Sequence, residues 1–300
     1  MEDKIPKIRG GSSQRLEYID FLLYWEGTIN RKQLSMRFGV STPQASADIG
    51  AYQERAPGNI EYDKSAKRYT ATPNFLPIFF RPNADRFLSQ LTALTAGIIL
   101  LKDTWILSPP PTSVIPLPTR RVEPQILRNV LSAVRGNYSI EVKYQSMNAT
   151  SPEPTWRRIT PHAFGSDGFR WHTRAYCHRT ERFKDFLLSR CFDVRGQAVP
   201  GPSASQDELW NSFFTVRLEP NPRLSEAQRR AIEADYDMRE GSVNLTVRRA
   251  LLYYFDKRLR LDITPNPELP KETPIVVANS ELYEASLREV NARRPISNAG

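Results

Sequence analysis

The sequence predicts a multidomain α+β protein, and three observations carry this prediction. A chain of 300 residues is long enough for about two domains. Its N-terminal part shows apolar residues at helical spacing, and its middle part shows short alternating strands. Strands mixed with helices then follow a break rich in Pro, Gly and Ser at residues 199–205. Hydrophobic residues make up 40% of the chain and charged residues 25%, which argues against a disordered, collagen-like or disulfide-scaffold chain.

The N-terminal elements predict a winged helix-turn-helix domain over residues 1–80. Residues 15–26 carry an apolar stripe at helical spacing. Asn30 is a suitable N-cap for a second helix that Gly39 ends, and Ser41 is a suitable N-cap for a third. A hairpin with a basic tip at residues 64–67 follows. Three short helices and a basic hairpin are the elements of this DNA-binding fold.

The rest of the chain predicts a linker and two further domains. Residues 81–122 combine an apolar helix over 84–107 with a stiff Pro-rich connector. A β-rich domain over 123–200 begins with a helix at 124–135 and continues with strands at 139–144, 157–164, 169–177 and 183–195. A small α+β domain over 206–300 has strands at 213–220, 242–247 and 275–278 and helices at 225–236 and 248–260.

The positive charge is concentrated in the β-rich segment. The whole chain has a net charge of +9, which indicates a polyanionic partner. Residues 120–200 hold 14 basic and 7 acidic side chains, whereas residues 1–80 hold 11 and 9. The small excess on the helix-turn-helix predicts modest affinity per domain, and therefore a dimer that reads two half-sites of double-stranded DNA.

The third helix is expected to enter the major groove with its N-terminal residues against base edges. Gln44 suits an adenine edge, and hydroxyl side chains suit phosphates. The candidates on and before this helix are Ser41, Thr42, Gln44, Ser46 and Gln53. The candidates for backbone contacts are Arg31, Lys32, Lys64, Lys67 and Arg68. The alternatives are a winged-helix domain that binds protein and a three-helix domain with a purely structural packing role.

The strand at 169–177 alternates cleanly. Trp171, Thr173 and Ala175 are expected to face the core, and Arg170, His172, Arg174 and Tyr176 the other side. Such cations are costly to bury without an anionic partner, and guanidinium groups match phosphates bidentately. If residues of neighbouring strands converge on this face, they form a phosphate-binding cleft. A solvated sheet face with scattered arginines is the alternative.

Residues 124–198 resemble a WYL domain, the Sm-like β-barrel sensor module of many bacterial transcription factors. Of the family's Trp-Tyr-Leu triplet, Trp171-His172-Thr173 retains the tryptophan, and a matching Arg-Ala-Tyr-Cys follows. The other matching positions are Tyr144, Ser146, Arg158, Pro161, His162, Arg182, Phe183, Ser189 and Arg190.

The whole architecture is similar to the BrxR/CapW-type regulators of bacterial anti-phage defence. This resemblance implies a homodimeric repressor of a defence operon, a C-terminal dimerisation domain and a pseudo-palindromic operator. It also implies an anionic nucleotide or oligonucleotide as ligand of the central domain. The expected ligand-binding residues are Tyr144, Ser146, Arg158, His162, Arg170, His172, Arg174, Arg182 and Arg190. A transcriptional activator is an alternative, because operator position decides between the two.

A nucleic-acid-processing enzyme is the remaining alternative, and its requirements are poorly met. The sequence contains neither a G-x-x-x-x-G-K-[ST] loop nor a G-x-S-x-G elbow. His172 and Ser146 have no orienting acid nearby in the sequence. Cys177 and Cys191 are too few for a four-cysteine zinc site and are expected to be reduced thiols. We therefore expect a cytoplasmic protein with no cofactor, no metal, no catalytic residues and no membrane contact.

Overall fold

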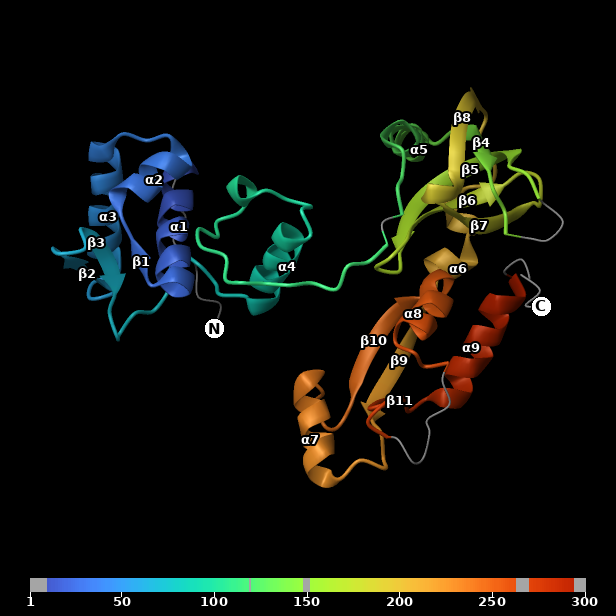
Figure 1. The fold of residues 1–300 in the computed structure, drawn as a ribbon. Coiled ribbons are helices and arrows are strands. Elements are labelled where there is room, and N and C mark those ends of the chain that lie inside the picture. Colours follow the sequence, from blue (N-terminus) through green and yellow to red (C-terminus); the bar gives the residue numbers. More distant parts are fainter. Residues whose placement is uncertain (1–9, 119, 148–151, 263–269, 294–300) are drawn as a thin grey trace. The chain divides into compact units, whose positions relative to one another are not determined.

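The computed structural model describes residues 10–118, 120–147, 152–262 and 270–293. The chain forms two compact units, residues 1–118 and 119–300 (Figure 1). The buried apolar side chains of each unit form hydrophobic cores within that unit. No helix of the described residues is long and apolar enough to cross a lipid bilayer.

The first unit begins with the predicted winged helix-turn-helix. Its helices are α1 (Gly10–Glu26), α2 (Arg31–Phe38) and α3 (Thr42–Arg55), and its strands are β1 (Thr28–Ile29), β2 (Ile60–Asp63) and β3 (Arg68–Ala71). The strands form an antiparallel sheet in the order β1-β3-β2. The predicted caps are confirmed: Asn30 and Gln33 form a capping box, and Gly39 ends α2 with a φ of 65°.

A buried carboxylate ties the chain after the wing to α1. Asp20 is fully buried among the apolar residues of α1. It accepts hydrogen bonds from the Tyr52 hydroxyl at 2.5 Å and from the backbone N–H groups of residues 78–80. Burial raises the pKa of Asp20, and these hydrogen bonds oppose that increase. Asp20 therefore links α1 with α3 and with the segment that follows β3.

The helix predicted over residues 84–107 is wrong in length. The structure forms α4 (Ala84–Thr95) and a separate turn of 3₁₀ helix, η1 (Leu101–Asp103). Gly97 adopts a φ of 68°, a left-handed conformation that ends the helix. The chain then turns back, and the Trp105 ring packs edge-to-face on Tyr18, with ring centroids 5.5 Å apart.

The second unit begins with a helix and a five-stranded antiparallel sheet. These are α5 (Pro124–Gly136), β4 (Ser139–Tyr144), β5 (Thr155–Ser166), β6 (Trp171–Cys177), β7 (Arg182–Leu187) and β8 (Cys191–Ala198). The strand order is β7-β6-β5-β4-β8. Helix α5 places Ile126, Val130 and Ala133 in the same core as the buried side chains of the sheet.

The single strand predicted over residues 183–195 is wrong, because a 3₁₀ turn, η2 (Leu188–Arg190), divides it into β7 and β8. These two strands lie at opposite ends of the sheet order although only three residues join them. The sheet must therefore curl strongly at this corner. In agreement, the Leu187 N–H on β7 donates to the Tyr144 hydroxyl on β4 at 3.4 Å.

The alternation predicted for β6 is confirmed except at its first residue. Thr173, Ala175 and Cys177 are fully buried on the core side. Trp171 was expected there too, but 57% of it is exposed. It is the first residue of the strand, opposite Ser166 at the end of a hairpin, so its side chain lies beyond the core.

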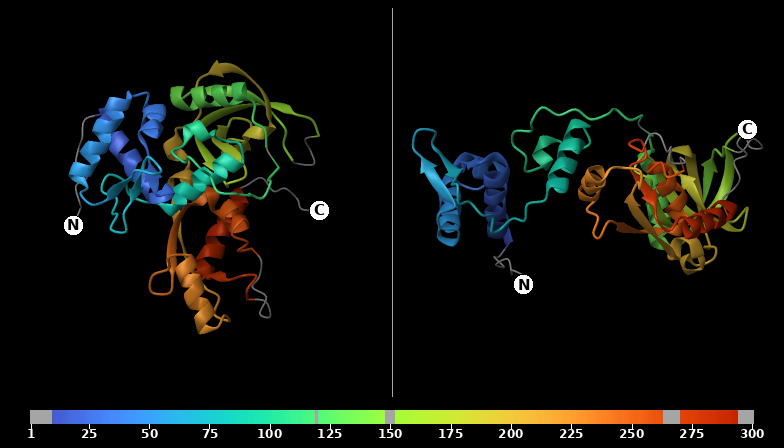
Figure 2. Two further views of the ribbon diagram at one scale, coloured as in Figure 1. Left: turned by 60° about the vertical axis from the view of Figure 1, so that its left-hand side comes forward. Right: turned by 90° about the horizontal axis from the view of Figure 1, so that it is seen from below.

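The C-terminal part adds a three-stranded antiparallel sheet in the order β10-β9-β11. Its elements are α6 (Glu208–Asn211), β9 (Phe213–Pro220), α7 (Glu226–Asp235), β10 (Val243–Arg248), η4 (Arg249–Leu251), α8 (Leu252–Arg258), β11 (Ile275–Val277) and α9 (Ser280–Arg293); a 3₁₀ turn, η3 (Ala204–Gln206), precedes them. Helices α8 and α9 pack against each other and against the strands (Figures 1 and 2). The capping box of Ser225 with Gln228 is confirmed, whereas α6 and α9 were not predicted.

Candidate nucleic-acid interface and sensor pocket

Helix α3 has the geometry of a recognition helix. The Ser41 hydroxyl accepts a hydrogen bond from the Gln44 N–H at 3.3 Å, so this hydroxyl caps the helix as predicted. Ile49 and Tyr52 are fully buried and fix the inward face. Of the other candidates on this helix, Thr42, Gln44 and Gln53 are exposed and Ser46 is half-buried.

Gln44 belongs to a hydrogen-bonded set that the sequence analysis missed. Its side-chain Nε2 donates to Oδ1 of Asp48 at 3.1 Å, one helical turn further along α3. Asp48 is 3% exposed, and Arg15 of α1 donates to both of its oxygens, at 2.6 and 3.1 Å. The four-residue spacing from Gln44 to Asp48 was visible in the sequence, but the pairing with Arg15 depends on how α1 and α3 pack.

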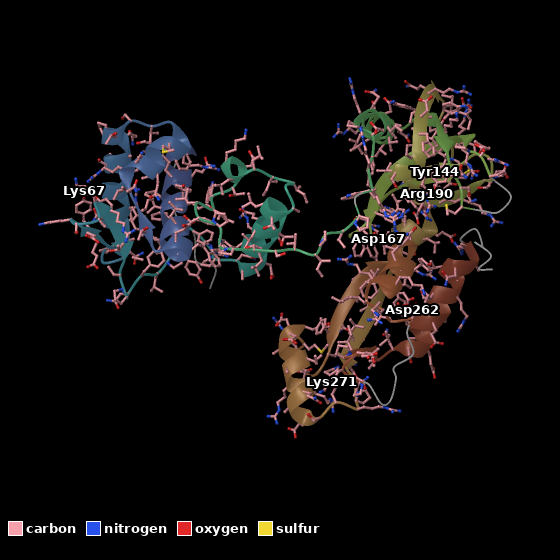
Figure 3. All side chains as sticks on the ribbon, in the orientation of Figure 1. Lys67, Tyr144, Asp167, Arg190, Asp262 and Lys271 are labelled. Carbon is pink, nitrogen blue, oxygen red and sulfur yellow. The ribbon has the colours of Figure 1, made fainter. Side chains whose placement is uncertain are left out.

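The hairpin of β2 and β3 carries the basic tip that was predicted. Lys64, Lys67 and Arg68 are exposed (Lys67 is labelled in Figure 3). The Asp63 carboxylate accepts hydrogen bonds from the backbone N–H groups of Ser65 and Ala66, at 2.8 and 2.9 Å. The tip is therefore a structured turn with three exposed cations.

Arg31 and Lys32 differ in what surrounds them. Lys32 is exposed. Arg31 donates from its Nη2 to the Tyr69 hydroxyl at 2.9 Å, and its guanidinium lies over the rings of Tyr62 and Tyr69. Arg31 was predicted as a contact to the DNA backbone, and the structure places it as a link between α2 and the hairpin.

A cavity of about 330 Å³ in the second unit is lined by some of the predicted ligand-binding residues. It is lined by Tyr144, Ser146, Arg170, His172, Arg174 and Arg190 from that set, and by Arg157 and Lys184 from the same sheet. Leu209, Ala250, Tyr253, Tyr254, Val290 and Arg293 line it from the C-terminal part. The cavity therefore lies between the sheet and the C-terminal elements.

Three of the cations that line this cavity have no carboxylate partner within the described part of the chain. Arg157, Lys184 and Arg190 form none of the salt bridges found between described residues. The buried Nε of Arg157 has no hydrogen-bond partner among the residues that the structure covers, and its guanidinium lies over the Tyr144 ring. Burial lowers the pKa of Lys184, and the charge of Arg157 adds to this effect.

Tyr144 lies beside two members of this cation cluster, Arg157 and Arg190; we define the cluster as Arg157, Lys184 and Arg190. Burial raises the pKa of Tyr144, and the hydrogen bond with Leu187 and the charge of Arg190 oppose that increase. Tyr144 and Arg190 lie next to each other (Figure 3). All three cations are half-buried, and like charges that are partly removed from water repel one another, so this arrangement is suited to an anionic group.

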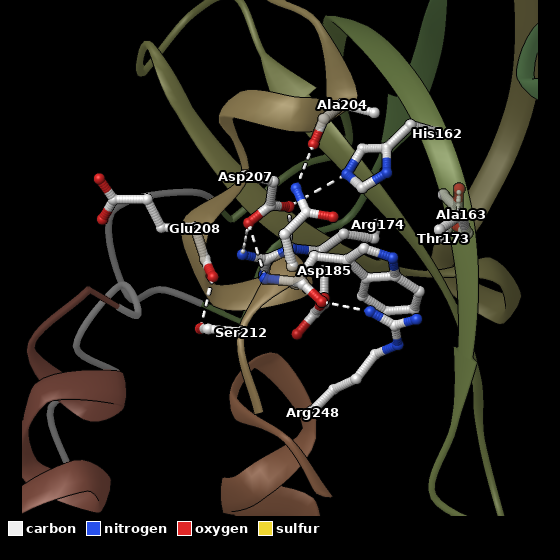
Figure 4. A network of polar contacts seen from close by, with 12 residues as sticks. His162, Ala163, Thr173, Arg174, Asp185, Ala204, Asp207, Glu208, Ser212 and Arg248 are labelled. Atoms are coloured by element: carbon white, nitrogen blue, oxygen red, sulfur yellow. Dashed lines mark hydrogen bonds and ion pairs between the residues drawn. The ribbon is translucent and has the colours of Figure 1, made fainter. Parts of the chain in front are cut away.

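Arg174 differs from the cation cluster because its guanidinium is paired with two carboxylates. Its Nε and Nη2 donate to the two oxygens of Asp207, at 2.7 and 3.0 Å, and its Nη1 donates to Asp185 at 3.2 Å (Figure 4). Asp207 also pairs with Nε2 of His162 at 3.0 Å. The anionic partner that this strand face was expected to need is supplied by the chain itself.

Asp207 was missed by the sequence analysis, which placed it at the start of the C-terminal domain and gave it no role. Its side chain also accepts from the Trp210 N–H at 3.2 Å and so caps α6. Burial alone raises the pKa of this carboxyl, but the hydrogen bonds from His162 and Arg174 and the charge of Arg174 outweigh it and lower the pKa to about 2. The Asp-Glu-Leu-Trp sequence at 207–210 offered an N-cap signal that could have drawn attention to it.

Three predicted ligand residues do not line this cavity, and two that line it, Arg170 and His172, have partners within the chain. Arg158 is exposed on β5 and, unlike its neighbour Arg157, is not among the residues that line the cavity. His162 follows a register shift on β5 and faces Asp207. Arg182 lines a second cavity, together with Asp207 and Glu208. Arg170 pairs with Asp167 at 2.6 Å, and the His172 ring packs on Tyr254 with centroids 4.7 Å apart.

Within the described ranges, no three His, Cys, Asp or Glu side chains are close enough to hold a metal ion. Cys177 and Cys191 are buried free thiols, and burial raises the pKa of Cys191 to about 12.

Comparisons with known proteins agree with this architecture. Residues 11–93 match the BrxR transcriptional regulator winged helix-turn-helix domain, residues 125–195 the WYL domain, and residues 213–283 the BrxR C-terminal dimerization domain. The DNA-binding transcriptional repressor CapW of Stenotrophomonas maltophilia is 39% identical over 285 residues, which cover 94% of each chain. The chain belongs to the CapW family of transcriptional repressors.

Two other CapW proteins are similar along most of their length. CapW of Escherichia coli is 36% identical over 281 residues, 94% of this chain and 93% of the relative. CapW of Pseudomonas aeruginosa is 38% identical over 273 residues, 91% of each. CapW proteins are named as repressors and not as enzymes, in agreement with the prediction that this chain is not an enzyme.

Proposed function

We propose that the protein is a homodimeric repressor that binds a pseudo-palindromic operator through two winged helices. The observation that carries this proposal is the exposed N-terminal end of α3 next to a basic hairpin, on a domain of the BrxR regulator type. The C-terminal match to a dimerization domain supports two copies per operator. The net charge of +2 over residues 1–80 gives one domain few phosphate contacts, so the second copy supplies the missing affinity.

The proposed DNA contacts follow from the exposed side chains. Thr42, Gln44 and the other polar residues at the start of α3 face the bases and nearby phosphates. Lys32 and the tip cations Lys64, Lys67 and Arg68 contact the DNA backbone. Arg31 holds the hairpin in position for them.

A second part of the proposal is that the central domain binds an anionic nucleotide or oligonucleotide. The cation cluster and Tyr144 support it, because three cations with no carboxylate partner among the described residues line the same cavity. The phosphate goes to this cluster rather than to Arg174, whose guanidinium already has two carboxylates. Ligand control of repression requires that the operator-bound and free states differ in ligand affinity.

We also propose that the curled sheet is an Sm-like barrel of the WYL type. The three-residue link between the outermost strands and the Leu187–Tyr144 hydrogen bond support this closure. The resemblance to BrxR/CapW regulators further supports a phage-defence operon as the regulated unit. If the operator lies upstream of the promoter, the same geometry serves an activator.

Operator binding is tested by fluorescence anisotropy with the DNA upstream of the protein's own gene. At physiological salt, this fragment should bind at least 100-fold more tightly than a shuffled fragment of the same composition. Equal affinity for the two fragments would remove the claim of a specific operator.

Ligand binding is tested by thermal shift of the full chain against short oligonucleotides and cyclic nucleotides. The full chain is needed because C-terminal residues form one wall of the cavity. A matched pair of variants compares an arginine that lines the cavity with one that does not. Arg190→Gln should abolish the thermal shift, whereas Arg158→Gln, at an exposed position of β5, should retain it. A shift that both variants retain would place the ligand elsewhere.

A further inference from the structure

The strongest unexplained feature outside the sensor pocket is the Arg15–Asp48–Gln44 set on the first unit. We propose that Asp48, anchored by Arg15, is a specificity-determining positioning residue that fixes the side-chain amide of Gln44 to read adenine. The proposal rests on the proposed function of α3 as the recognition helix.

The chemistry of the carboxylate fixes the orientation of the amide. An ionised carboxylate only accepts hydrogen bonds, so the Gln44 NH₂ group, and not its oxygen, must face Asp48. The Nε2–Oδ1 distance of 3.1 Å fits this arrangement. One of the two N–H bonds of Gln44 is therefore used within the protein, and one N–H and Oε1 remain for a partner.

This remaining pair discriminates between the two purines. In the major groove, adenine offers N7 as acceptor and N6 as donor, which match one N–H and one oxygen. Guanine offers two acceptors, N7 and O6, and a bidentate contact to them requires two donors. A Gln44 amide held by Asp48 therefore suits adenine and makes only one good hydrogen bond to guanine.

Asp48 itself has no freedom to turn away. Arg15 holds both of its oxygens from a different helix, and only 3% of Asp48 is exposed. The guanidinium is a donor at every nitrogen, so both Asp48 oxygens act as acceptors toward Arg15. Arg15 acts on base choice through two intermediaries without contacting the DNA.

The experiment is in vitro selection from randomised duplexes with the full chain. Wild type should enrich adenine at one position per half-site, and Gln44→Ala should lose this preference. Asp48→Asn is nearly isosteric. Arg15 should attract the new amide oxygen and turn the new NH₂ group toward Gln44. The Gln44 amide should then reverse and present both N–H bonds, so that the adenine-to-guanine ratio falls about tenfold or more at that position.

Two further variants complete the test. Glu54→Gln removes the same charge from an exposed position of α3 and should leave the base preference unchanged. Arg15→Gln releases Asp48 while keeping its carboxylate, and should relax the same position even if Asp48→Asn folds poorly. An undiminished adenine preference in Arg15→Gln and in any folded Asp48→Asn would overturn the inference, and so would a Gln44→Ala variant with no position altered. Failure of wild type to enrich any sequence would instead overturn the proposed operator binding.

Discussion

Asp207 offers the sharpest test of how the second unit is held together. The change Asp207→Asn keeps the size of the side chain and an acceptor for the α6 cap, since asparagine is also a good N-cap. It removes the negative charge beside Arg174 and replaces one acceptor by a donor that faces a guanidinium. Arg174 is 5% exposed, so the loss is not compensated by water.

The expected magnitude follows from the pKa of Asp207. The difference between its ordinary value of 3.8 and about 2 corresponds to about 2 kcal/mol of stability. The new N–H donors of Asn face the donors of the Arg174 guanidinium, which adds to this loss, whereas Asp185 still neutralises part of the Arg174 charge. We therefore expect the free energy of unfolding to fall by about 3 kcal/mol. Removal of one partner from a buried ion pair generally costs about 3–5 kcal/mol.

Hydrogen exchange of the full chain measures this effect locally, because strand β6 carries Arg174. Amide groups of residues 171–177 should exchange roughly 100-fold faster in Asp207→Asn. Glu208→Gln is the matched control: it changes the adjacent carboxylate, whose side chain is 74% exposed and pairs with Arg293. Surface pairs of this kind contribute about 0–1 kcal/mol, so exchange should change less than about fivefold. Equal effects of the two substitutions would refute the assignment of Asp207 as an anchor.

The pH dependence gives an independent readout of the same charge. Because the pKa of Asp207 is lower in the folded protein, its ionised form stabilises the fold above about pH 4. This contribution disappears as the pH falls through about 2. In urea unfolding, the difference between wild type and Asp207→Asn should therefore shrink between about pH 5 and pH 2. A difference that stays constant over this range would contradict the pKa assignment.

Three further predictions concern the two binding surfaces. Lys184→Ala and Arg190→Gln should each weaken oligonucleotide binding about tenfold or more in calorimetry, while operator affinity stays within a factor of two of wild type. A loss of oligonucleotide and operator binding together would contradict two separate sites. Lys64→Ala and Lys67→Ala should each lower the slope of log affinity against log salt by about one without changing sequence preference, whereas altered preference would place them at base edges. Arg31→Lys keeps the charge but lacks the planar group that lies over the two tyrosines, so operator affinity should fall several-fold; unchanged affinity would show that the hairpin needs no such link.

Local signals in the sequence were sufficient for most of the fold. Caps at Asn30, Ser41 and Ser225 and the basic hairpin predicted elements that the structure confirms, because capping and turn chemistry depend on neighbouring residues. The helix predicted over 84–107 was too long because the apolar pattern continues past Gly97, where the chain ends the helix and turns back onto α1.

The candidate sites depend on long-range packing, and there the sequence was less informative. The alternation of β6 correctly placed His172 and Arg174 on one face, but not what covers that face. Asp207 lies 33 positions from Arg174, and no local pattern joins them. Likewise, the pair of Arg15 and Asp48 spans two helices. Long-range ion pairs decide which cations remain available to a ligand, and they emerge only from the folded chain.

In the proposed function, operator DNA and an anionic ligand bind at two different sites, and ligand binding controls operator binding. One titration tests it: a labelled upstream fragment bound to the full chain, with a short oligothymidylate added while anisotropy is followed. Wild type should release the operator as the oligonucleotide is added. The double variant of Lys184→Ala and Arg190→Gln should bind the operator normally and retain it at the same oligonucleotide concentration. Equal release from both proteins would mean direct competition at the winged helix, and no release from wild type would mean that the two sites are not coupled. Either result would contradict ligand control through a separate site.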